Sequence, residues 1–176
     1  MSRIDHGTRE IACTVLYCGP PGSGKSSSLR YLGGRARHRQ AFSTNRTDIL
    51  SLDLGTIAGY AVRFRVYAPG SDASGGSHRL MLRGADGVVF VADSQAVRFD
   101  DNRAGLEALL DARDPAIPLL IQYNKQDLPA EFLVPPAELA AALGPGHPGV
   151  PTDALHGPGV FEAFSMLASL VLARFA

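Results

Sequence analysis

The segment that most constrains this chain is Gly19 to Ser26, which reads GPPGSGKS and satisfies the phosphate-binding pattern G-x-x-x-x-G-K-[ST] in full. The apolar run Ile11–Cys18 (IACTVLYC) precedes it and reads as a buried strand, and a helical pattern begins at Lys25. A strand, a glycine-rich loop and a helix in this order place several backbone N–H groups at the positive end of a helix, where they bind anionic phosphate. The segment therefore predicts an α/β fold with a phosphate site at the end of this strand.

Each residue type in the loop has a chemical role. Gly22 and Gly24 permit backbone conformations and a close approach to phosphate that a side chain would block. Lys25 is expected to reach the β- and γ-phosphates, and the Ser26 hydroxyl is expected to ligate Mg²⁺. The residues expected to contact the phosphates are Gly19, Gly22, Ser23, Gly24, Lys25, Ser26 and Ser27. The loop predicts a bound nucleoside triphosphate and leaves the base open.

Along the rest of the chain, apolar runs of strand length alternate with helical patterns. Further strands are expected at Ile49–Leu54, Ala61–Tyr67, Gly87–Asp93 and Ile117–Tyr123, the first two as an antiparallel hairpin. Helices are expected at 25–32, 102–112, 136–143 and 160–174, and loops at 35–48, 69–77 and 144–151. This alternation predicts one α/β domain over residues 1–176, with a central, mostly parallel sheet flanked by helices.

Composition excludes several classes of protein. Hydrophobic residues make up 45% of the chain and charged residues 19%, which is typical of a globular protein and not of a disordered one. The formal net charge of zero gives no general attraction to nucleic acid or to an anionic membrane. The N-terminus has no signal-peptide pattern and no apolar run has transmembrane length, so we expect a cytoplasmic protein without stable membrane insertion. Cys13 and Cys18 are expected to be buried thiols on opposite faces of one strand.

The segment Asn124-Lys125-Gln126-Asp127 directly follows the expected strand Ile117–Tyr123, at the edge of the sheet where ligands bind in open α/β folds. A carboxylate here can accept hydrogen bonds from guanine N1–H and from the 2-amino group, a pair of donors that adenine lacks. Removing one partner of such a buried pair costs roughly 2–5 kcal/mol. The segment therefore predicts a guanine site made by Asn124, Lys125 and Asp127, and both motifs together predict GTP or GDP with Mg²⁺.

These two motifs resemble those of the Ras-like small GTPases, and the resemblance covers nearly the whole chain. A closer resemblance is to the bacterial gliding-motility GTPase family MglA. The segments that carry it are Arg9-Glu10-Ile11, Leu82–Ser94 (LRGADGVVFVADS), Asn124–Pro129, Gly159-Val160-Phe161 and Leu170–Arg174 (LVLAR). The resemblance implies a Ras-like P-loop GTPase domain that acts as a molecular switch in cell polarity or motility. It also implies a roadblock-domain regulator of the MglB kind, an effector protein, and backbone contacts from Ala154 and Leu155 to the guanine O6.

The first switch segment is similar to the family but shorter. Arg46-Thr47 resembles the Arg-Thr pair of MglA, which implies Thr47 as a Mg²⁺ ligand and Arg46 as a built-in arginine finger. Because the segment after Thr47 is shortened, Thr44 is a rival ligand. A solvated basic loop without a catalytic role is the other interpretation of Arg46.

The second switch segment departs further from the family. Ras-like proteins carry D-x-x-G-Q here and MglA carries P-G-Q, whereas this chain reads Pro69-Gly70-Ser71-Asp72. Gly70 can still donate its N–H to the γ-phosphate, but Ser71 or Asp72 stands where the water-orienting glutamine is expected. Serine is too short for that role and aspartate adds negative charge beside the phosphoryl group. His78 follows in the same loop and could orient water, although a surface histidine is usually inert.

The sequence therefore leaves two functions open. In the first, the protein is a regulatory GTPase with slow or partner-dependent hydrolysis, which Ser26 and the Arg46-Thr47 pair favour. In the second, it is a pseudo-GTPase scaffold that binds nucleotide without turnover, which the missing glutamine favours. A metabolite kinase is disfavoured because the chain has no insertion of lid length.

Overall fold

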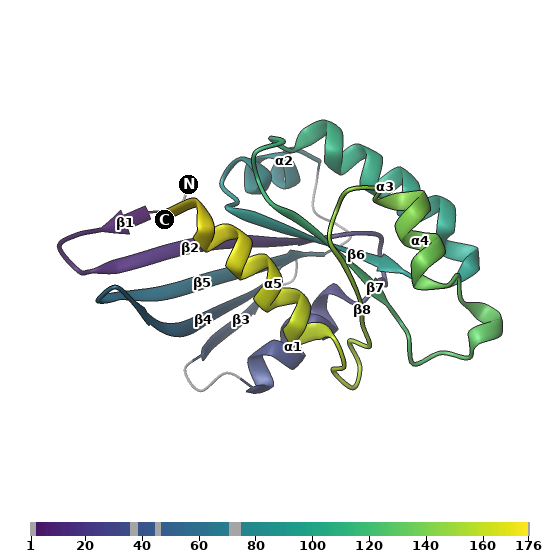
Figure 1. Cartoon of the computed structure of the whole chain (residues 1–176), viewed down its shortest axis with the longest axis horizontal. Coiled ribbons are helices and arrows are strands. Elements are labelled where there is room, and N and C mark those ends of the chain that lie inside the picture. The colour runs from purple at the N-terminus through teal and green to yellow at the C-terminus, as the bar shows by residue number, and fades with distance from the viewer. Residues whose placement is uncertain (1–2, 36–38, 45–46, 71–74, 176) are drawn as a thin grey trace.

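The computed structural model describes residues 3–35, 39–44, 47–70 and 75–175 (Figure 1). Its centre is an eight-stranded sheet in which seven strands follow the order β3-β4-β5-β2-β6-β7-β8 and β1 pairs with β2. The strands are β1 Arg3–Asp5, β2 Glu10–Cys18, β3 Arg39–Thr44, β4 Thr47–Ile57, β5 Tyr60–Pro69, β6 Gly87–Asp93, β7 Leu119–Asn124 and β8 Gly149–Pro151. Parallel pairing joins β5, β2, β6, β7 and β8, so the expected parallel core of the sheet is confirmed.

Helices cover both faces of this sheet, as a doubly wound α/β fold requires. They are α1 Lys25–Arg35, α2 Gly75–Arg83, α3 Phe99–Ala112, α4 Pro136–Leu143 and α5 Val160–Leu172, with 3₁₀ turns η1 Ala96–Arg98, η2 Ala130–Phe132 and η3 Ala173–Phe175. Leu29 of α1 and Phe164 of α5 belong to one core, and α5 crosses the strands in front of the sheet in Figure 1. Leu82 of α2, Leu106 of α3 and Leu139 of α4 belong to the core on the opposite face.

The burial of the central strands explains their sequences. Every residue of β6 and of β7 is buried, because each strand has neighbours on both sides and helices above and below. Cys13 and Cys18 of β2 lie in different cores, which confirms that they face opposite sides of the sheet. Burial raises the pKa of both thiols to about 12, so both are neutral at physiological pH.

The antiparallel part of the sheet confirms the hairpin and corrects two neighbouring expectations. β4 and β5 pair in antiparallel register from Thr47↔Pro69 to Ile57↔Tyr60. The expected loop at 35–48 is wrong in part, because it contains β3, which pairs with β4 from Arg39↔Leu52 to Thr44↔Thr47. The alternation that marks a strand is weak in this polar, basic stretch, and the strand forms because the edge of β4 offers unpaired backbone groups.

Other element boundaries also differ from expectation. α1 does not stop at Gly33-Gly34 but continues to Arg35, because Gly33 is buried and tertiary packing outweighs its weak helix propensity. The expected loop at 69–77 is wrong at its end, since α2 begins at Gly75, and this helix was not predicted. The connector at 144–151 includes the short strand β8, which pairs with β7. The short strand β1 was missed, because three residues are too few for a periodic pattern.

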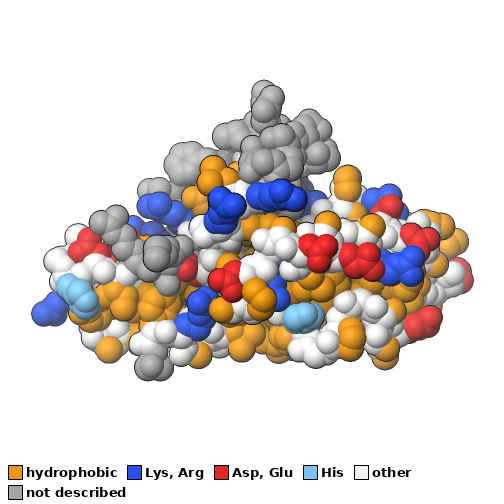
Figure 2. Space-filling view, turned by 90° about the horizontal axis from the view of Figure 1, so that it is seen from above, with side chains coloured by type: hydrophobic (Ala, Val, Ile, Leu, Met, Phe, Trp, Pro, Cys, Tyr) orange, Lys and Arg blue, Asp and Glu red, His pale blue; other side chains and the backbone are white. Residues whose placement is uncertain are grey.

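The surface agrees with the neutral composition. Figure 2 shows acidic, basic and hydrophobic side chains interspersed over the face that it presents. Within the described part of the chain, no helix combines the length and apolarity needed to cross a membrane.

Candidate functional site

The predicted phosphate loop lies between β2 and α1, where the sequence places it. Ser23 N–H donates to the Pro20 carbonyl at 3.2 Å, and Ser28 N–H donates to the Gly24 carbonyl at 2.9 Å. Gly22 and Gly24 have φ angles of 76° and 109°, in the region that side chains disfavour. A Cβ atom on Gly24 would lie 2.0 Å from Nδ2 of Asn124. Glycine is therefore required here both by conformation and by space.

The side chain of Lys25 folds back onto the backbone of this loop. Its Nζ donates to the carbonyl oxygens of Gly19 and Pro20, each at 2.9 Å. Burial lowers the pKa of Lys25, although the nearby Cys18 opposes the shift. The Ser23 hydroxyl is fully buried and has no hydrogen-bond partner among the described residues. The Lys25 ammonium group therefore lies against the backbone of the loop, held by two of its carbonyl oxygens.

Asn124 joins the base motif to this loop. Its Nδ2 donates to the Ser23 carbonyl at 2.7 Å across 101 residues of sequence. Its Oδ1 accepts from the Ala154 N–H at 2.9 Å and from the Thr152 hydroxyl at 3.1 Å. Because Asn124 is only 3% exposed, all of these hydrogen bonds are protected from water. One side chain therefore holds three segments of the candidate site together.

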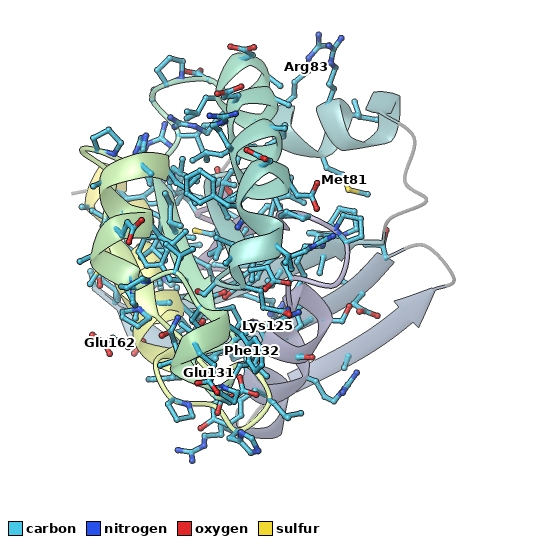
Figure 3. All side chains as sticks on the ribbon, turned by 90° about the vertical axis from the view of Figure 1, so that its right-hand side faces the viewer. Met81, Arg83, Lys125, Glu131, Phe132 and Glu162 are labelled. Atoms are coloured by element: carbon cyan, nitrogen blue, oxygen red, sulfur yellow. The ribbon has the colours of Figure 1, made fainter. Side chains whose placement is uncertain are left out.

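The other residues of the base motif occupy the turn after β7, where Lys125 is labelled in Figure 3. Lys125 has a φ of 72° and its Nζ lies 2.7 Å from Oδ2 of the buried Asp93. Gln126 Nε2 donates to the Ser94 hydroxyl at 2.8 Å. Asp127 is exposed, so its carboxylate is accessible to a ligand. The structure thus brings the predicted base-binding residues to the end of the sheet that also carries the phosphate loop.

The loop at 153–156 approaches the base motif from the other side. Oδ1 of Asp153 accepts from the N–H groups of Leu155 at 2.9 Å and His156 at 3.0 Å, and Oδ2 lies 2.6 Å from His156 Nδ1. Burial favours neutral Asp153, but the hydrogen bonds from His156 and Leu155 outweigh it, so the pKa of this carboxyl lies below its ordinary value. The Ala154 and Leu155 N–H groups both donate within the protein, so a contact with guanine O6 would have to share or replace these hydrogen bonds.

The switch residues are placed only in part. Arg46, Ser71 and Asp72 lie outside the described residues. Thr47 is not in a loop but opens β4, paired with Thr44 of β3 on one side and with Pro69 of β5 on the other. Gly70 follows directly after β5 and is exposed, while His78 lies in α2. The ends of the two predicted switch segments are therefore neighbours in the sheet.

Sequence reasoning missed a polar cluster behind the base motif. Asp93, at the end of β6, accepts from Lys125 and also lies 3.9 Å from Nε of Arg98. Asn102 of α3 fixes the backbone of Asp93, because its Oδ1 accepts from the Asp93 N–H at 2.9 Å and its Nδ2 donates to the Asp93 carbonyl at 2.7 Å. The available signal was an acidic residue at the carboxyl end of a central strand, where ligand sites occur.

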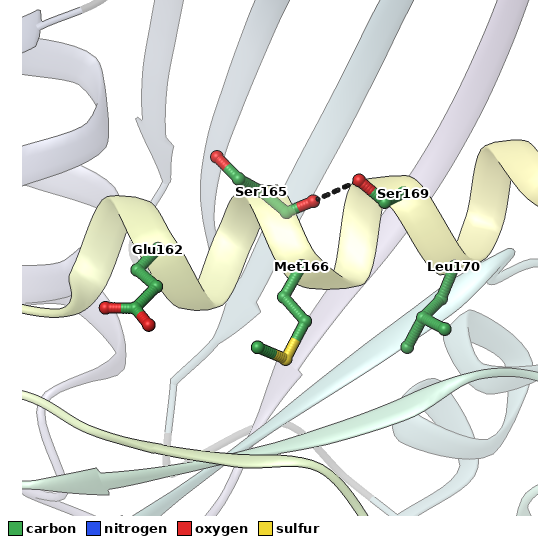
Figure 4. A pocket seen from close by; sticks show the side chains of 5 residues that line it. All are labelled: Glu162, Ser165, Met166, Ser169 and Leu170. Atoms are coloured by element: carbon green, nitrogen blue, oxygen red, sulfur yellow. Dashed lines mark hydrogen bonds between the residues drawn. The ribbon is translucent and has the colours of Figure 1, made fainter.

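A hollow in the surface lies away from these motifs. It is a groove of about 500 Å³ along the outer face of α5, lined by Glu162, Ser165, Met166, Ser169 and Leu170 (Figure 4). All five residues come from one helix, and the Ser169 hydroxyl donates to the Ser165 carbonyl within that helix. The groove therefore brings together no polar groups from different elements, and we assign it no role.

Comparison with known proteins identifies a relative that aligns with almost the whole chain. No protein-family model matches the sequence. The chain is 38% identical to the mutual gliding-motility protein MglA of Myxococcus xanthus (strain DK1622) over 192 aligned positions, which cover 98% of this chain and 96% of the relative. An alignment of this length includes both motifs and the loops between them.

Proposed function

We propose that this chain, which belongs to the MglA family of Ras-like small GTPases, binds GTP and GDP with Mg²⁺ and acts as a nucleotide-dependent switch. The process that it controls would be motility, which the name of its relative gives, or cell polarity, which the family resemblance implies. The whole chain would act as one GTPase domain, since one sheet runs from its first to its last described strand.

The observation that carries this proposal is the hydrogen bond from Asn124 to the Ser23 carbonyl. It fixes the phosphate loop and the base motif relative to each other, so that one nucleotide can contact both. The phosphates would meet the backbone N–H groups of 22–27 and the ammonium of Lys25, and the base would meet Asp127. Adenine would leave the carboxylate of Asp127 without its two donors, which is a strong penalty in a desolvated site.

Mg²⁺ fits the hydroxyl oxygens that the site presents. Ser26 is an exposed residue in the first turn of α1, next to Lys25. Thr47 is the first residue of β4 and pairs with Pro69 at the end of β5. Both would hold the ion, with Thr44 as the alternative to Thr47. When bound, Mg²⁺ would neutralise charge on the phosphates.

The test of nucleotide binding uses the whole chain with mant-labelled nucleotides. Wild-type protein should bind mant-GDP and reject mant-ADP, and Lys25→Ala should release GDP much faster. Arg30→Ala is the matched control, because Arg30 is an exposed cation on the same helix.

Asp127→Asn should shift the preference from guanine toward xanthine. Equal affinity of the wild type for GDP and ADP would refute the guanine site.

GTP hydrolysis distinguishes the two candidate functions, the regulatory GTPase and the pseudo-GTPase scaffold. The sequence Pro69-Gly70-Ser71 lacks the glutamine of the family, which favours slow turnover or none. Arg46 could offset this loss, since an arginine finger contributes roughly 10³–10⁵ in rate. Single-turnover GTP hydrolysis, with and without a roadblock-domain protein of the MglB kind, separates a partner-dependent GTPase from a scaffold. Acceleration by that partner supports the GTPase, and no turnover in either condition supports the scaffold.

A further inference from the structure

We infer that Arg98 and Asp93 are positioning residues that connect the phosphate loop to the base motif and thereby slow the release of nucleotide. This inference rests on the proposed nucleotide site but concerns residues outside its two motifs. The connection runs from the Pro21 carbonyl through the Arg98 guanidinium and the Asp93 carboxylate to the ammonium of Lys125.

The Arg98 guanidinium donates a hydrogen bond to one carbonyl and forms ion pairs with two carboxylates. Its Nη2 donates to the Pro21 carbonyl at 2.8 Å, its Nη1 lies 2.7 Å from Asp101 Oδ2, and its Nε lies 3.9 Å from Asp93 Oδ2. Pro21 belongs to the phosphate loop and is 77 residues away in sequence. A planar guanidinium can bridge acceptors in fixed directions, which a lysine ammonium cannot do equally well.

Asp93 gives the connection a rigid centre. Its side chain is 1% exposed, so its charge must be compensated by cations within the protein. Lys125 and Arg98 supply these cations at 2.7 Å and 3.9 Å. The amide of Asn102 holds the backbone N–H and carbonyl of Asp93. The carboxylate itself is held by Gln95, whose backbone N–H and Nε2 donate to Asp93 Oδ1 at 3.1 Å and 3.3 Å.

Lys125 needs such support because of its backbone. Its φ of 72° lies in the left-handed region, which is unfavourable for a residue with a side chain. The ion pair with Asp93 helps to hold this conformation, and Lys125 stands two positions before Asp127. Arg98 therefore acts on the base motif through Asp93 and on the phosphate loop through Pro21. Its loss loosens both ends of a bound nucleotide at once.

The experiment measures the dissociation rate of mant-GDP from the full chain with excess Mg²⁺. Arg98→Ala should raise this rate about tenfold, which corresponds to the loss of about 1.4 kcal/mol of stabilisation of the bound state. The association rate constant should change by less than about twofold, because interface changes act mainly on dissociation. Arg98→Lys should recover part of the retention. Arg103→Ala is the matched control, since it removes an exposed arginine that pairs with Asp100 in the same helix.

Asp93→Asn tests the path of the effect. In that background Arg98→Ala should have a smaller effect than in the wild type, because the route through Asp93 is already broken. An equal effect in both backgrounds, or equal dissociation rates for Arg98→Ala and Arg103→Ala, overturns the positioning role. If wild-type protein retains no GDP, the proposed function falls as well; if it retains GDP and Arg98→Ala does not accelerate release, only this inference falls.

Discussion

Replacing Asn124 by alanine should destabilise the protein even without any ligand. The substitution removes the partner of three buried groups: the Ser23 carbonyl, the Ala154 N–H and the Thr152 hydroxyl. An unsatisfied buried polar group costs about 1–3 kcal/mol, so the three together should cost at least about 3 kcal/mol. In a protein of this size each kcal/mol lowers the melting temperature by about 2–4 °C, which gives an expected loss of about 6–12 °C.

The assay is thermal unfolding followed by circular dichroism, with Asp127→Ala as the control variant in the same motif. Asp127 is exposed, so its replacement should change stability by less than about 0.5 kcal/mol while removing guanine selectivity. Asn124→Asp gives a second comparison, because it keeps an acceptor for the Ala154 N–H and the Thr152 hydroxyl but places a carboxylate oxygen against the Ser23 carbonyl. If Asn124→Ala and Asp127→Ala had the same melting temperature, Asn124 would not hold the three segments together.

Three further predictions follow from the same structure. Gly24→Ala should lower the melting temperature more than Gly22→Ala, because both residues have positive φ but only the added Cβ at Gly24 would meet Asn124; equal losses would contradict this. The folded-state pKa of Asp153 is depressed, so its ionised form stabilises the fold above the unfolded value of about 3.9, and this stabilisation is lost as pH falls through the folded pKa. The difference between the urea midpoints of wild type and Asp153→Asn should therefore begin to shrink only as pH falls below about 3.9, and a difference that stays constant there would argue against this linkage. Both cysteines are buried with a pKa of about 12 and should react with a thiol reagent only after unfolding, so rapid labelling of either one in the native protein would contradict this prediction.

The sequence by itself determined the features that depend on local patterns. The loop Gly19–Ser26 needs a strand before it and a helix after it, and all three are present where the pattern places them. The runs at 87–93 and 117–123 predicted central strands, since a strand covered on both faces must be apolar throughout. The structure confirms the first without change and shifts the second to Leu119–Asn124.

Only the tertiary structure decided which distant residues meet. The contacts Asn124 to Ser23, Arg98 to Pro21 and Lys125 to Asp93 depend on strand order and register, which no local pattern encodes. The strand β3 is a similar case, because its weak pattern becomes a strand only beside the open edge of β4. Local periodicity reports the environment of each segment, whereas the partner of a polar side chain is set by how separate segments pack together.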